Sequence, residues 1–400
     1  MGKRILLVNK FFYTRGGAEV VAINLRDELT ARGYVVGIFT MAYHHVDEVE
    51  YLYEAPEVSF KRGLAGKVKF ARRTLGGYHI EEAFTRALDD FKPDVVHLHN
   101  IHSYLSPAVA RLAHERRCRV VWTMHDYKLV CPSYSCLNHG QTCERCLTHR
   151  HAILTQRCFK DSYAAGALAW LEARRWNRRR LEQWVDALVC PSEFLHDMML
   201  RGGWNPDKLH VLNNFIDPVK LRALDEETLP REDYVAYVGR LSHEKGVDTL
   251  LQVARETPSV TLKLAGNGPL RLSLTAQYGS LPNVEFVGQL DAAQVANFVS
   301  RAACMVVPSE WYENNPLTII EAQCAGTPVV GSNMGGIPEL VVPGNGIIFE
   351  AGDRTALTEA LDRALHTEWD HAGIRVRGRK RFSADVHLAR LLKLYFSDLS

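Results

Sequence analysis

A chain of 400 residues is long enough for two or three domains with sizeable cores. Its 48 Lys and Arg residues nearly balance its 46 Asp and Glu residues, so the overall charge does not indicate a nucleic-acid-binding protein. No uncharged run approaches the roughly 20 residues that a membrane-spanning helix needs, and the first residues lead into a strand without a signal-peptide cleavage pattern. We therefore expect a cytoplasmic α/β protein.

The first elements are a strand, a glycine loop and a helix. Residues 4–9 (RILLVN) are typical of a buried parallel strand. The loop that follows contains Gly16 and Gly17 and leads into a helix predicted to extend to about Arg32. This arrangement can place backbone N–H groups around a phosphate. The fingerprint G-x-G-x-x-G is absent, and the alternative is that the glycines only permit the turn.

After a second strand, predicted over residues 35–41, residues 60–75 combine basic and apolar positions at helical spacing. The apolar positions are Phe60, Leu64, Val68, Ala71 and Leu75, and the basic ones are Lys61, Arg62, Lys67, Lys69, Arg72 and Arg73. A basic amphipathic helix is typical of an element that lies on a membrane surface. A solvated helix face is an alternative of at least equal weight.

Histidines follow the next two predicted strands, over residues 93–99 and 119–123. His99 ends the first strand, and His125 stands in Thr-x-His-Asp at the end of the second. Residues at the carboxyl ends of parallel strands line the binding crevice of such sheets. Although a single histidine is usually structural, this position favours a functional role for His125 and leaves both interpretations open for His99.

The next segment, residues 131–158, is unusually rich in cysteine. Five of its 28 residues are cysteines: Cys131, Cys136, Cys143, Cys146 and Cys158. Clustered thiols in a chain without a secretion signal are more often metal ligands than disulfides, and the spacing of Cys143 and Cys146 is that of a chelating pair. We expect a structural zinc site with Cys131, Cys143, Cys146 and Cys158, in which Cys136 or a histidine could substitute. An Fe–S cluster and a thioredoxin-like use are weaker alternatives.

A long helix is predicted over residues 164–183, where arginines and tryptophans are interleaved. This pattern occurs in single-strand nucleic-acid binders, but a packed helix with one cationic face is the commoner explanation. The strand that follows closes in Pro191-Ser192-Glu193, which Pro308-Ser309-Glu310 repeats later. The repetition indicates two similar halves, and we place the boundary near residues 211–215, before a polar linker over 217–232.

The second half opens with a strand over residues 234–238, followed by a loop with Arg240 and Lys245 between glycines. Two cations five residues apart at the carboxyl end of a strand suit a diphosphate, because arginine binds it as a fork and lysine as a point charge. A solvated charge pair is the alternative. Further strands are predicted over residues 261–266 and 284–287.

A strand over residues 304–307 then leads into a stretch with two carboxylates, Glu313 and Glu321, around a predicted helix start. We expect Asn315 to cap this helix and Pro316 to occupy its first position. The free N–H groups of the first helical turn, together with the helix dipole, form an anion site. The stretch therefore suits a ligand with phosphates and hydroxyls.

Taken in order, the GGAE loop at 16–19, the Thr-x-His-Asp of His125, G-R-x4-K-G at 239–246 and the E-x7-E of Glu313 and Glu321 resemble the retaining glycosyltransferases of family 4. The resemblance covers essentially the whole chain. It implies the GT-B fold, an α/β fold with two doubly wound Rossmann-like domains facing across a cleft. Residues 1–213 would form the acceptor domain and residues 214–379 the donor domain, with a C-terminal helix within 380–400 crossing back.

The resemblance also implies a reaction, which is the transfer of a sugar from a nucleotide diphosphate sugar. Arg240 and Lys245 would hold the diphosphate in place of a metal ion, and the absence of a D-x-D triplet fits such a metal-independent enzyme. Glu321 would accept hydrogen bonds from the ribose, Glu313 would contact the donor sugar near its anomeric carbon, and His125 would help to hold that sugar. The remaining donor-binding positions are Gly16, Gly17, Asn314, Asn315, Leu317 and Thr318. Retention through a covalent intermediate on Glu313 and retention through same-face attack both stay open.

The expected acceptor is a glycan or a lipid-linked sugar from cell-surface polysaccharide or glycolipid assembly. The basic segment suggests peripheral contact with the inner face of the membrane, and the cysteine-rich segment would shape the acceptor side. Two other classes remain: a nucleotide-sugar epimerase or hydrolase of the same fold, and a non-enzymatic two-domain binding protein. Acceptor-dependent release of the nucleoside diphosphate separates a transferase from both.

Overall fold

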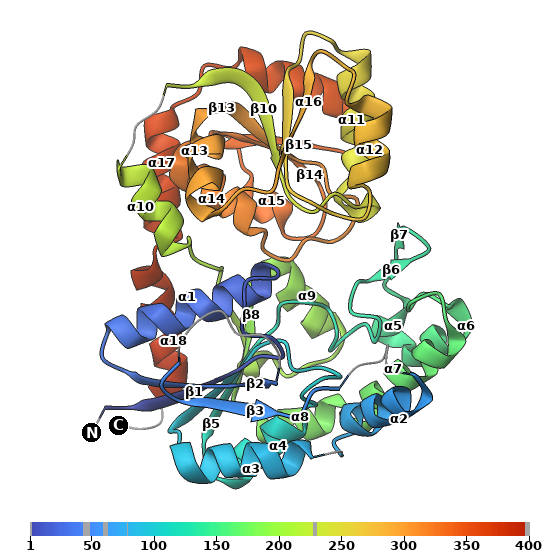
Figure 1. Cartoon of the computed structure of the whole chain (residues 1–400), viewed down its shortest axis with the longest axis vertical. Coiled ribbons are helices and arrows are strands. Elements are labelled where there is room, and N and C mark those ends of the chain that lie inside the picture. The colour runs from blue at the N-terminus through green and yellow to red at the C-terminus, as the bar shows by residue number, and fades with distance from the viewer. Residues whose placement is uncertain (1, 43–48, 59–62, 78, 227–229, 397–400) are drawn as a thin grey trace. The chain divides into compact units, whose positions relative to one another are not determined.

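The computed structural model describes residues 2–42, 49–58, 63–77, 79–226 and 230–396 (Figure 1). The chain divides into two compact units. The first consists of residues 1–139, 143–212 and 389–400, and the second of residues 140–142 and 213–388. Each unit has its own parallel sheet with helices on it, as the sequence predicted.

The sheet of the first unit has seven strands in the order β3-β2-β1-β4-β5-β8-β9. All neighbouring strands are parallel. Their bounds are β1 Arg4–Val8, β2 Val35–Met41, β3 Leu52–Ala55, β4 Val95–Leu98, β5 Arg119–Thr123, β8 Ala187–Cys190 and β9 Leu209–Val211. The central strands are apolar throughout because helices cover both faces of the sheet, and residues 5–8 of β1 are at most 1% exposed.

The helices of the first unit lie on both sides of this sheet, with α1 on one side and α3 and α4 on the other (Figure 1). The longer helices are α1 Gly17–Ala31, α2 Gly63–Thr74, α3 Ile80–Phe91, α4 Ala108–Glu115, α7 Tyr163–Arg175, α8 Arg178–Trp184 and α9 Glu193–Arg201. Short elements are β6 Leu137–Asn138, β7 Gln141–Thr142, α5 Arg145–Thr148, α6 Ile153–Gln156 and the 3-10 turns Arg150–Ala152 and Pro206–Lys208. The last turn of α18 (Ala384–Phe396) packs on this unit, where Tyr395 Oη lies 2.6 Å from His97 Nδ1.

The sheet of the second unit has six strands in the order β12-β11-β10-β13-β14-β15. Its strands are β10 Glu232–Val238, β11 Leu262–Ala265, β12 Val284–Gly288, β13 Ala302–Val307, β14 Val329–Ser332 and β15 Gly346–Phe349. Its helices are α10 Pro218–Glu226, α11 Val247–Glu256, α12 Arg271–Tyr278, α13 Ala292–Arg301, α14 Leu317–Ala325, α15 Ile337–Leu340, α16 Arg354–His366 and α17 His371–Arg381, with a 3-10 turn at His243–Lys245. Alternate residues of β10 face two separate cores, Val235 and Tyr237 in one, Tyr234 and Ala236 in the other. The sheet is therefore covered on both faces, as a doubly wound domain requires.

Two predictions about connecting segments were wrong. The expected polar linker over residues 217–232 contains helix α10 and the first residue of β10, and its residues 227–229 lie outside the described part. The expected single helix over residues 164–183 is two helices, because the side chain of Asn177 accepts a hydrogen bond from Arg180 N and starts α8 anew. Trp176, at the break, is buried and donates to the carbonyl of Thr74 at 2.9 Å.

The basic segment forms a helix, α2, in which two of the predicted apolar positions are exposed and one of the predicted basic positions is buried. Phe60, Lys61 and Arg62 lie outside the described residues. The predicted apolar positions Leu64 and Val68 are 80% and 51% exposed. Arg73, one of the predicted basic positions, is fully buried because its guanidinium donates to two backbone carbonyls, those of Pro56 and Tyr104.

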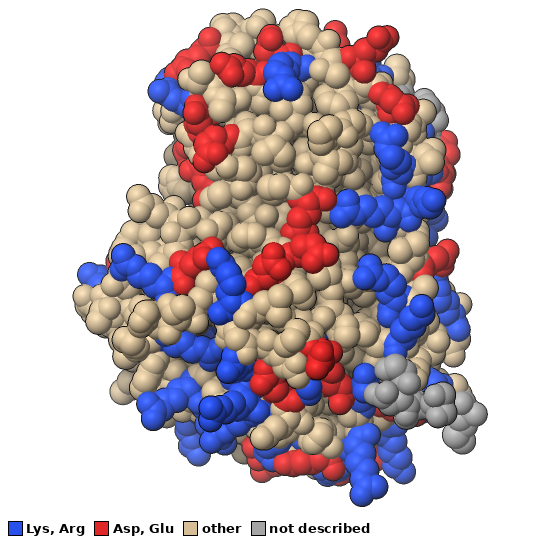
Figure 2. All heavy atoms as spheres, turned by 180° about the vertical axis from the view of Figure 1, so that it is seen from behind, with Lys and Arg blue, Asp and Glu red and all other residues tan. Residues whose placement is uncertain are grey.

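Cationic side chains are abundant on the surface of the first unit. Figure 2 shows Lys and Arg gathered over its lower-left part. In helices α7 and α8 the exposed arginines are Arg174, Arg175, Arg179 and Arg180. Within the described residues, no helix is both long enough and apolar enough to cross a bilayer.

Candidate active site

In the second unit, the loops after two neighbouring strands carry the predicted site residues. Strand β10 pairs with β13, so the loop with Arg240 and Lys245 meets the loop with Glu313. Lys245 Nζ lies 2.6 Å from Glu313 Oε1, which also accepts hydrogen bonds from Ser309 Oγ at 2.6 Å and Trp311 Nε1 at 2.9 Å. Three donors thus converge on one carboxylate oxygen.

This convergence keeps Glu313 ionised although it is only 7% exposed. Burial has the largest effect on its pKa and raises it. The charge of Lys245 and the hydrogen bonds from Lys245, Ser309 and Trp311 together outweigh burial, so the net pKa lies below the usual value. The carboxylate is therefore a fixed negative charge beside a lysine.

Two glycines allow these loops to approach closely. Gly246, directly after Lys245, has φ +66°, and a Cβ there would come within 1.8 Å of Pro308 O. Gly335 has φ +61°, and a Cβ there would come within 2.2 Å of Glu313 O, which accepts a hydrogen bond from Gly336 N. Both positions need glycine for space as well as for backbone conformation.

The second carboxylate, Glu321, has one engaged oxygen and one without a partner. Its Oε1 lies 2.5 Å from Lys220 Nζ in helix α10. Its Oε2 is buried and has no hydrogen-bond partner among the described residues. Burial, the largest effect, raises the pKa of Glu321, and the charge of Lys220 opposes that rise. The oxygen without a partner can accept a hydrogen bond from a ligand hydroxyl.

Asn315 does not cap helix α14, which corrects the prediction. Its Oδ1 accepts from Asn214 N at 2.8 Å, and the cap position is held by Pro316, which cannot cap with its side chain. The helix begins one residue later, at Leu317, and ends at Gly326, which has the left-handed conformation. Asn315 Nδ2 is buried and has no partner among the described residues. The N–H groups of the first turn of α14, which contains Leu317 and Thr318, have no side-chain cap. Together with Asn315 Nδ2 they place several hydrogen-bond donors next to Asn314.

Arg240 occupies the same loop as Lys245, but its side chain is exposed. Its carbonyl accepts a hydrogen bond from Tyr237 Oη at 2.8 Å, which holds the backbone of the loop. Within the described residues no ion pair of its guanidinium occurs, so the fork is available to an anion.

In the first unit, the predicted strand-end histidines meet. His99 Nδ1 and His125 Nε2 are 3.0 Å apart, and their rings stack at 5.3 Å. Burial, and after it the charge of Lys10, lowers the pKa of His125 to about 3. His125 is therefore a neutral hydrogen-bonding group at neutral pH. Gly16, exposed, is the cap residue of α1, and Gly17 is its first residue.

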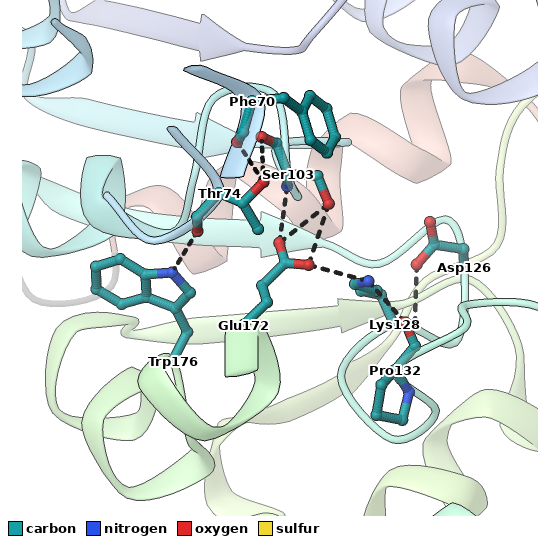
Figure 3. A network of polar contacts seen from close by, with 8 residues as sticks. All are labelled: Phe70, Thr74, Ser103, Asp126, Lys128, Pro132, Glu172 and Trp176. Carbon is teal, nitrogen blue, oxygen red and sulfur yellow. Dashed lines mark hydrogen bonds and ion pairs between the residues drawn. The ribbon is translucent and has the colours of Figure 1, made fainter. Parts of the chain in front are cut away.

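The first unit also contains a cavity of about 380 Å³ near these histidines. At its inner end, Lys128 Nζ lies 3.0 Å from Glu172 Oε2 and donates to Pro132 O at 2.6 Å (Figure 3). Glu172 Oε1 accepts from Ser103 N at 2.8 Å. Asp126 Oδ1 accepts from Lys128 N at 2.9 Å. The volume falls within the range of small-molecule sites.

Sequence reasoning missed Lys10, Lys128 and Glu172 in this cavity. A signal for Glu172 was present, because it lies on the same side of helix α7 as the buried Ala165 and Ala169. A carboxylate on a buried stripe indicates a polar partner inside. For Lys10 and Lys128 there was no comparable signal.

The cysteines of the 131–158 segment do not form the predicted zinc site. The thiols of Cys136 and Cys146 donate hydrogen bonds to Cys131, which lower the pKa of Cys131. Within the described residues, which include all five cysteines, no group of three or more His, Cys, Asp or Glu side chains is arranged to hold a metal ion. The set Cys131, Cys143, Cys146 and Cys158 is thus not supported as a metal site.

Two family models match the chain, one for each half. The model described as Glycosyltransferase Family 4 matches residues 15–220, and the model described as Glycosyl transferases group 1 matches residues 224–381.

Individual proteins are similar over different lengths. An uncharacterized 42.6 kDa protein in the cps region of Klebsiella pneumoniae is 24% identical over 84% of this chain and 87% of its own. The glycogen synthase of Mycobacterium tuberculosis (strain CDC 1551 / Oshkosh) is 32% identical over 46% of this chain, and the match spans only 48% of that enzyme. Among solved structures, Anabaena HepE in complex with UDP and glucose has a TM-score of 0.67 and 17% identity, covering 99% of this chain and 100% of its own.

Proposed function

Because the chain belongs to glycosyltransferase family 4, we propose that it is a retaining enzyme that transfers a hexose from a nucleotide diphosphate sugar to a glycan or lipid-linked acceptor. One observation carries the proposal: Glu321 Oε2, on helix α14, and Asn315 Nδ2, just before that helix, are buried and have no partner among the described residues. Buried polar atoms are nearly always hydrogen-bonded in proteins. A ligand with hydroxyl groups, such as the ribose of a nucleotide, would satisfy them.

The diphosphate of the donor would bind at the loop after β10. Arg240 contributes an exposed guanidinium, and Lys245 an ammonium that Glu313 now holds at 2.6 Å. Positive groups that already point at the leaving diphosphate stabilise the charge that develops as the sugar leaves. The transfer would therefore proceed without a divalent metal ion.

Same-face attack is the retaining route that the geometry of Glu313 favours. Three hydrogen bonds converge on Glu313 Oε1, and together with the charge of Lys245 they lower the pKa of the carboxylate, which makes it a weaker nucleophile. Glu313 would instead hold Lys245 and contact the donor sugar. His125, which is neutral, would donate or accept one hydrogen bond to that sugar.

The acceptor would bind in the first unit, and its class is suggested by a relative. The Klebsiella protein is encoded in a cps region, so we propose a role in the assembly of a cell-surface polysaccharide.

Leu64 and Val68 protrude from α2 beside the exposed Lys67, Lys69 and Arg72. This combination supports peripheral contact with an anionic membrane surface. Flotation with vesicles of phosphatidylglycerol and phosphatidylcholine tests that contact: binding that Leu64→Ser leaves unchanged would argue against it.

Turnover can be tested before the acceptor is known. A thermal-shift panel of nucleotides and nucleotide sugars should identify the donor, since a ligand at ~100 times its Kd adds about 2.7 kcal/mol to the free energy of unfolding. With that donor, release of the nucleoside diphosphate should require a membrane or glycan extract that contains acceptor. Release without any acceptor would identify a hydrolase instead, and binding without turnover under any condition would identify a binding protein.

A further inference from the structure

Part of the cavity in the first unit has a wall of aromatic rings with cations over them. The rings of Phe11 and Tyr104 line the cavity, and their centres are 5.6 Å apart. Lys10 Nζ lies 5.9 Å from the centre of the Phe11 ring and 6.0 Å from that of Tyr104, and the Arg15 guanidinium lies 4.4 Å from Phe11. An aromatic surface beside fixed positive charge suits a ligand with an apolar face and a negative group.

Another aromatic ring in the lining, Phe159, also has cations beside it. Lys128 Nζ lies 5.3 Å from the centre of its ring and Lys160 Nζ 5.4 Å. Lys128 is neutralised by its ion pair with Glu172, and both side chains are at most 6% exposed. Lys160 is exposed at the rim. The lining cations outside this ion pair are therefore Lys10, Arg15 and Lys160.

The charges that face this cavity do not cancel. Lys128 and Glu172 neutralise each other. The remaining charged residues of the lining are three cations, Lys10, Arg15 and Lys160, and two carboxylates, Glu19 and Asp126. Burial is the largest effect on the pKa of both Glu19 and Asp126 and raises it, so the cavity disfavours their negative charge. The balance is positive.

Lys10 is the cation best placed to act on a ligand. It is half-buried and follows the carboxyl end of β1. Its charge is felt by groups on separate elements, since it opposes the raised pKa of Glu19 and of Asp126 and contributes to the lowered pKa of His102 and of His125. It forms no ion pair with any described residue. A half-buried cation without a counter-ion is a position that a ligand anion would stabilise.

We propose that this cavity binds an anionic saccharide, a sugar ring with a phosphate or carboxylate group, with the ring against Phe11 and Tyr104 and the anion at Lys10. That this saccharide is the acceptor of the transfer rests on the proposed function. That the cavity binds it does not. A sugar ring has one apolar face for the aromatic wall and hydroxyl groups for Asn100 and Asp126, which also line the cavity. The phosphate of a lipid-linked sugar and the carboxylate of an acidic glycan share this chemistry.

Binding of three probes with the same ring tests the proposal: glucose, glucose 1-phosphate and glucuronic acid. Saturation-transfer NMR on the full chain should show that at least one anionic probe binds about tenfold or more tightly than glucose, because hydrogen bonds to charged groups are the stronger ones. Preference for glucose 1-phosphate indicates a phosphate-bearing acceptor, and preference for glucuronic acid an acidic glycan. Equal binding of all three overturns the proposal.

Lys10→Gln should abolish the preference for the anionic probe, and Lys10→Arg should retain it. Lys3→Gln is the matched control: Lys3 precedes β1 where Lys10 follows it, and it pairs with Asp94 at 3.5 Å away from the cavity. The control should keep the full preference. A preference that Lys10→Gln leaves intact contradicts the assignment of Lys10.

Two further measurements place the ligand. Leu168→Trp should fill the cavity and abolish binding of every probe, with binding of the nucleotide to the second unit and the thermal midpoint unchanged. Probe binding that survives in this variant means that the anion lies elsewhere. If Lys10→Gln weakens nucleotide binding as much as probe binding, Lys10 contacts the donor and the proposal is wrong. Absence of turnover with any acceptor would contradict the proposed function but leave these binding results intact.

Discussion

Lys220 and Glu321 form an ion pair across two helices of the second unit, with Nζ and Oε1 2.5 Å apart and side chains only 15% and 6% exposed. The pair engages one oxygen of the carboxylate and leaves Oε2 buried without a partner among the described residues. Lys220 thereby holds Glu321 in one orientation and offsets the burial that raises its pKa. If Oε2 receives the ribose of the donor, Lys220 prepares that contact without touching the ligand.

Lys220→Met should destabilise the protein at neutral pH. Removing one partner of a buried pair leaves an uncompensated charge, which costs ~3 kcal/mol. The folded-state pKa of Glu321 is already above its unfolded value, so the folded state takes up a proton as pH falls and gains stability relative to the unfolded state. The variant should therefore recover part of its loss on acidification through the folded-state pKa.

Urea unfolding at pH 7.5 and at pH 5.5 measures both effects. Lys380→Met, which removes an exposed lysine of the same unit, should change the free energy of unfolding by less than ~0.5 kcal/mol. Equal losses for the two variants at both pH values would show that Lys220 does not stabilise a charged Glu321.

Glu321→Gln should weaken donor binding with little change in kcat. The substitution keeps the shape but removes the charge that strengthens a hydrogen bond from a hydroxyl, a loss of about 1–2 kcal/mol. The expected result is a rise of about 5- to 30-fold in donor KM. The loss should shrink when the donor lacks its 2′- and 3′-hydroxyls, since those are the groups that Oε2 would contact; an equal loss for the deoxy donor would assign Glu321 to another part of the ligand.

Arg240→Ala should lower kcat more than it raises donor KM. A positive group that stabilises charge only as the diphosphate leaves acts mainly in the transition state, and losing one such contact costs on the order of 10²–10³ in rate. Steady-state kinetics at saturating donor measures the effect. Arg363→Ala, which removes an exposed arginine of helix α16, is the control and should leave kcat unchanged. A wild-type kcat in Arg240→Ala would remove Arg240 from the site.

Gly246→Ala should disrupt the loop that carries Lys245. The new Cβ would approach Pro308 O to 1.8 Å, and φ is +66°, so both a clash and backbone strain oppose the alanine. Gly352→Ala isolates the strain alone, because φ there is +77° and the nearest atom, Glu310 Cδ, is 4.0 Å away. Urea unfolding should show a cost of about 1 kcal/mol for Gly352→Ala and a clearly larger one for Gly246→Ala, with loss of kcat only in the latter.

Much of the backbone was predictable because it follows from local pattern. Apolar runs located β2 and β5 at the residues where the structure has them, and the predicted C-terminal helix agrees with α18. Gly326 ends helix α14 because a left-handed cap favours glycine. These features depend on neighbours within a few positions of the chain, which a sequence displays directly.

The exceptions arose where a side chain found a distant partner. Asn315 had the residue type and spacing of a helix cap, but Asn214 takes its oxygen. Arg73 looked like one more surface cation, yet two carbonyls from other segments bind it in the interior. The cysteine spacing suggested a metal site, but among the described residues no group of three or more His, Cys, Asp or Glu side chains is arranged to hold one.

The sequence alone therefore determined two parallel-sheet domains and the strand-end loops that carry the candidate site residues, since strand period, glycine positions and strand-end polar residues are local properties. Only the tertiary structure decided which groups meet. Lys245 and Glu313 are 68 positions apart and Lys220 and Glu321 are 101 apart, and the first of these pairs forms because the strand order puts β13 next to β10. The charge state, orientation and available oxygen of each carboxylate follow from those partners, which the spacing of residues along a chain does not specify.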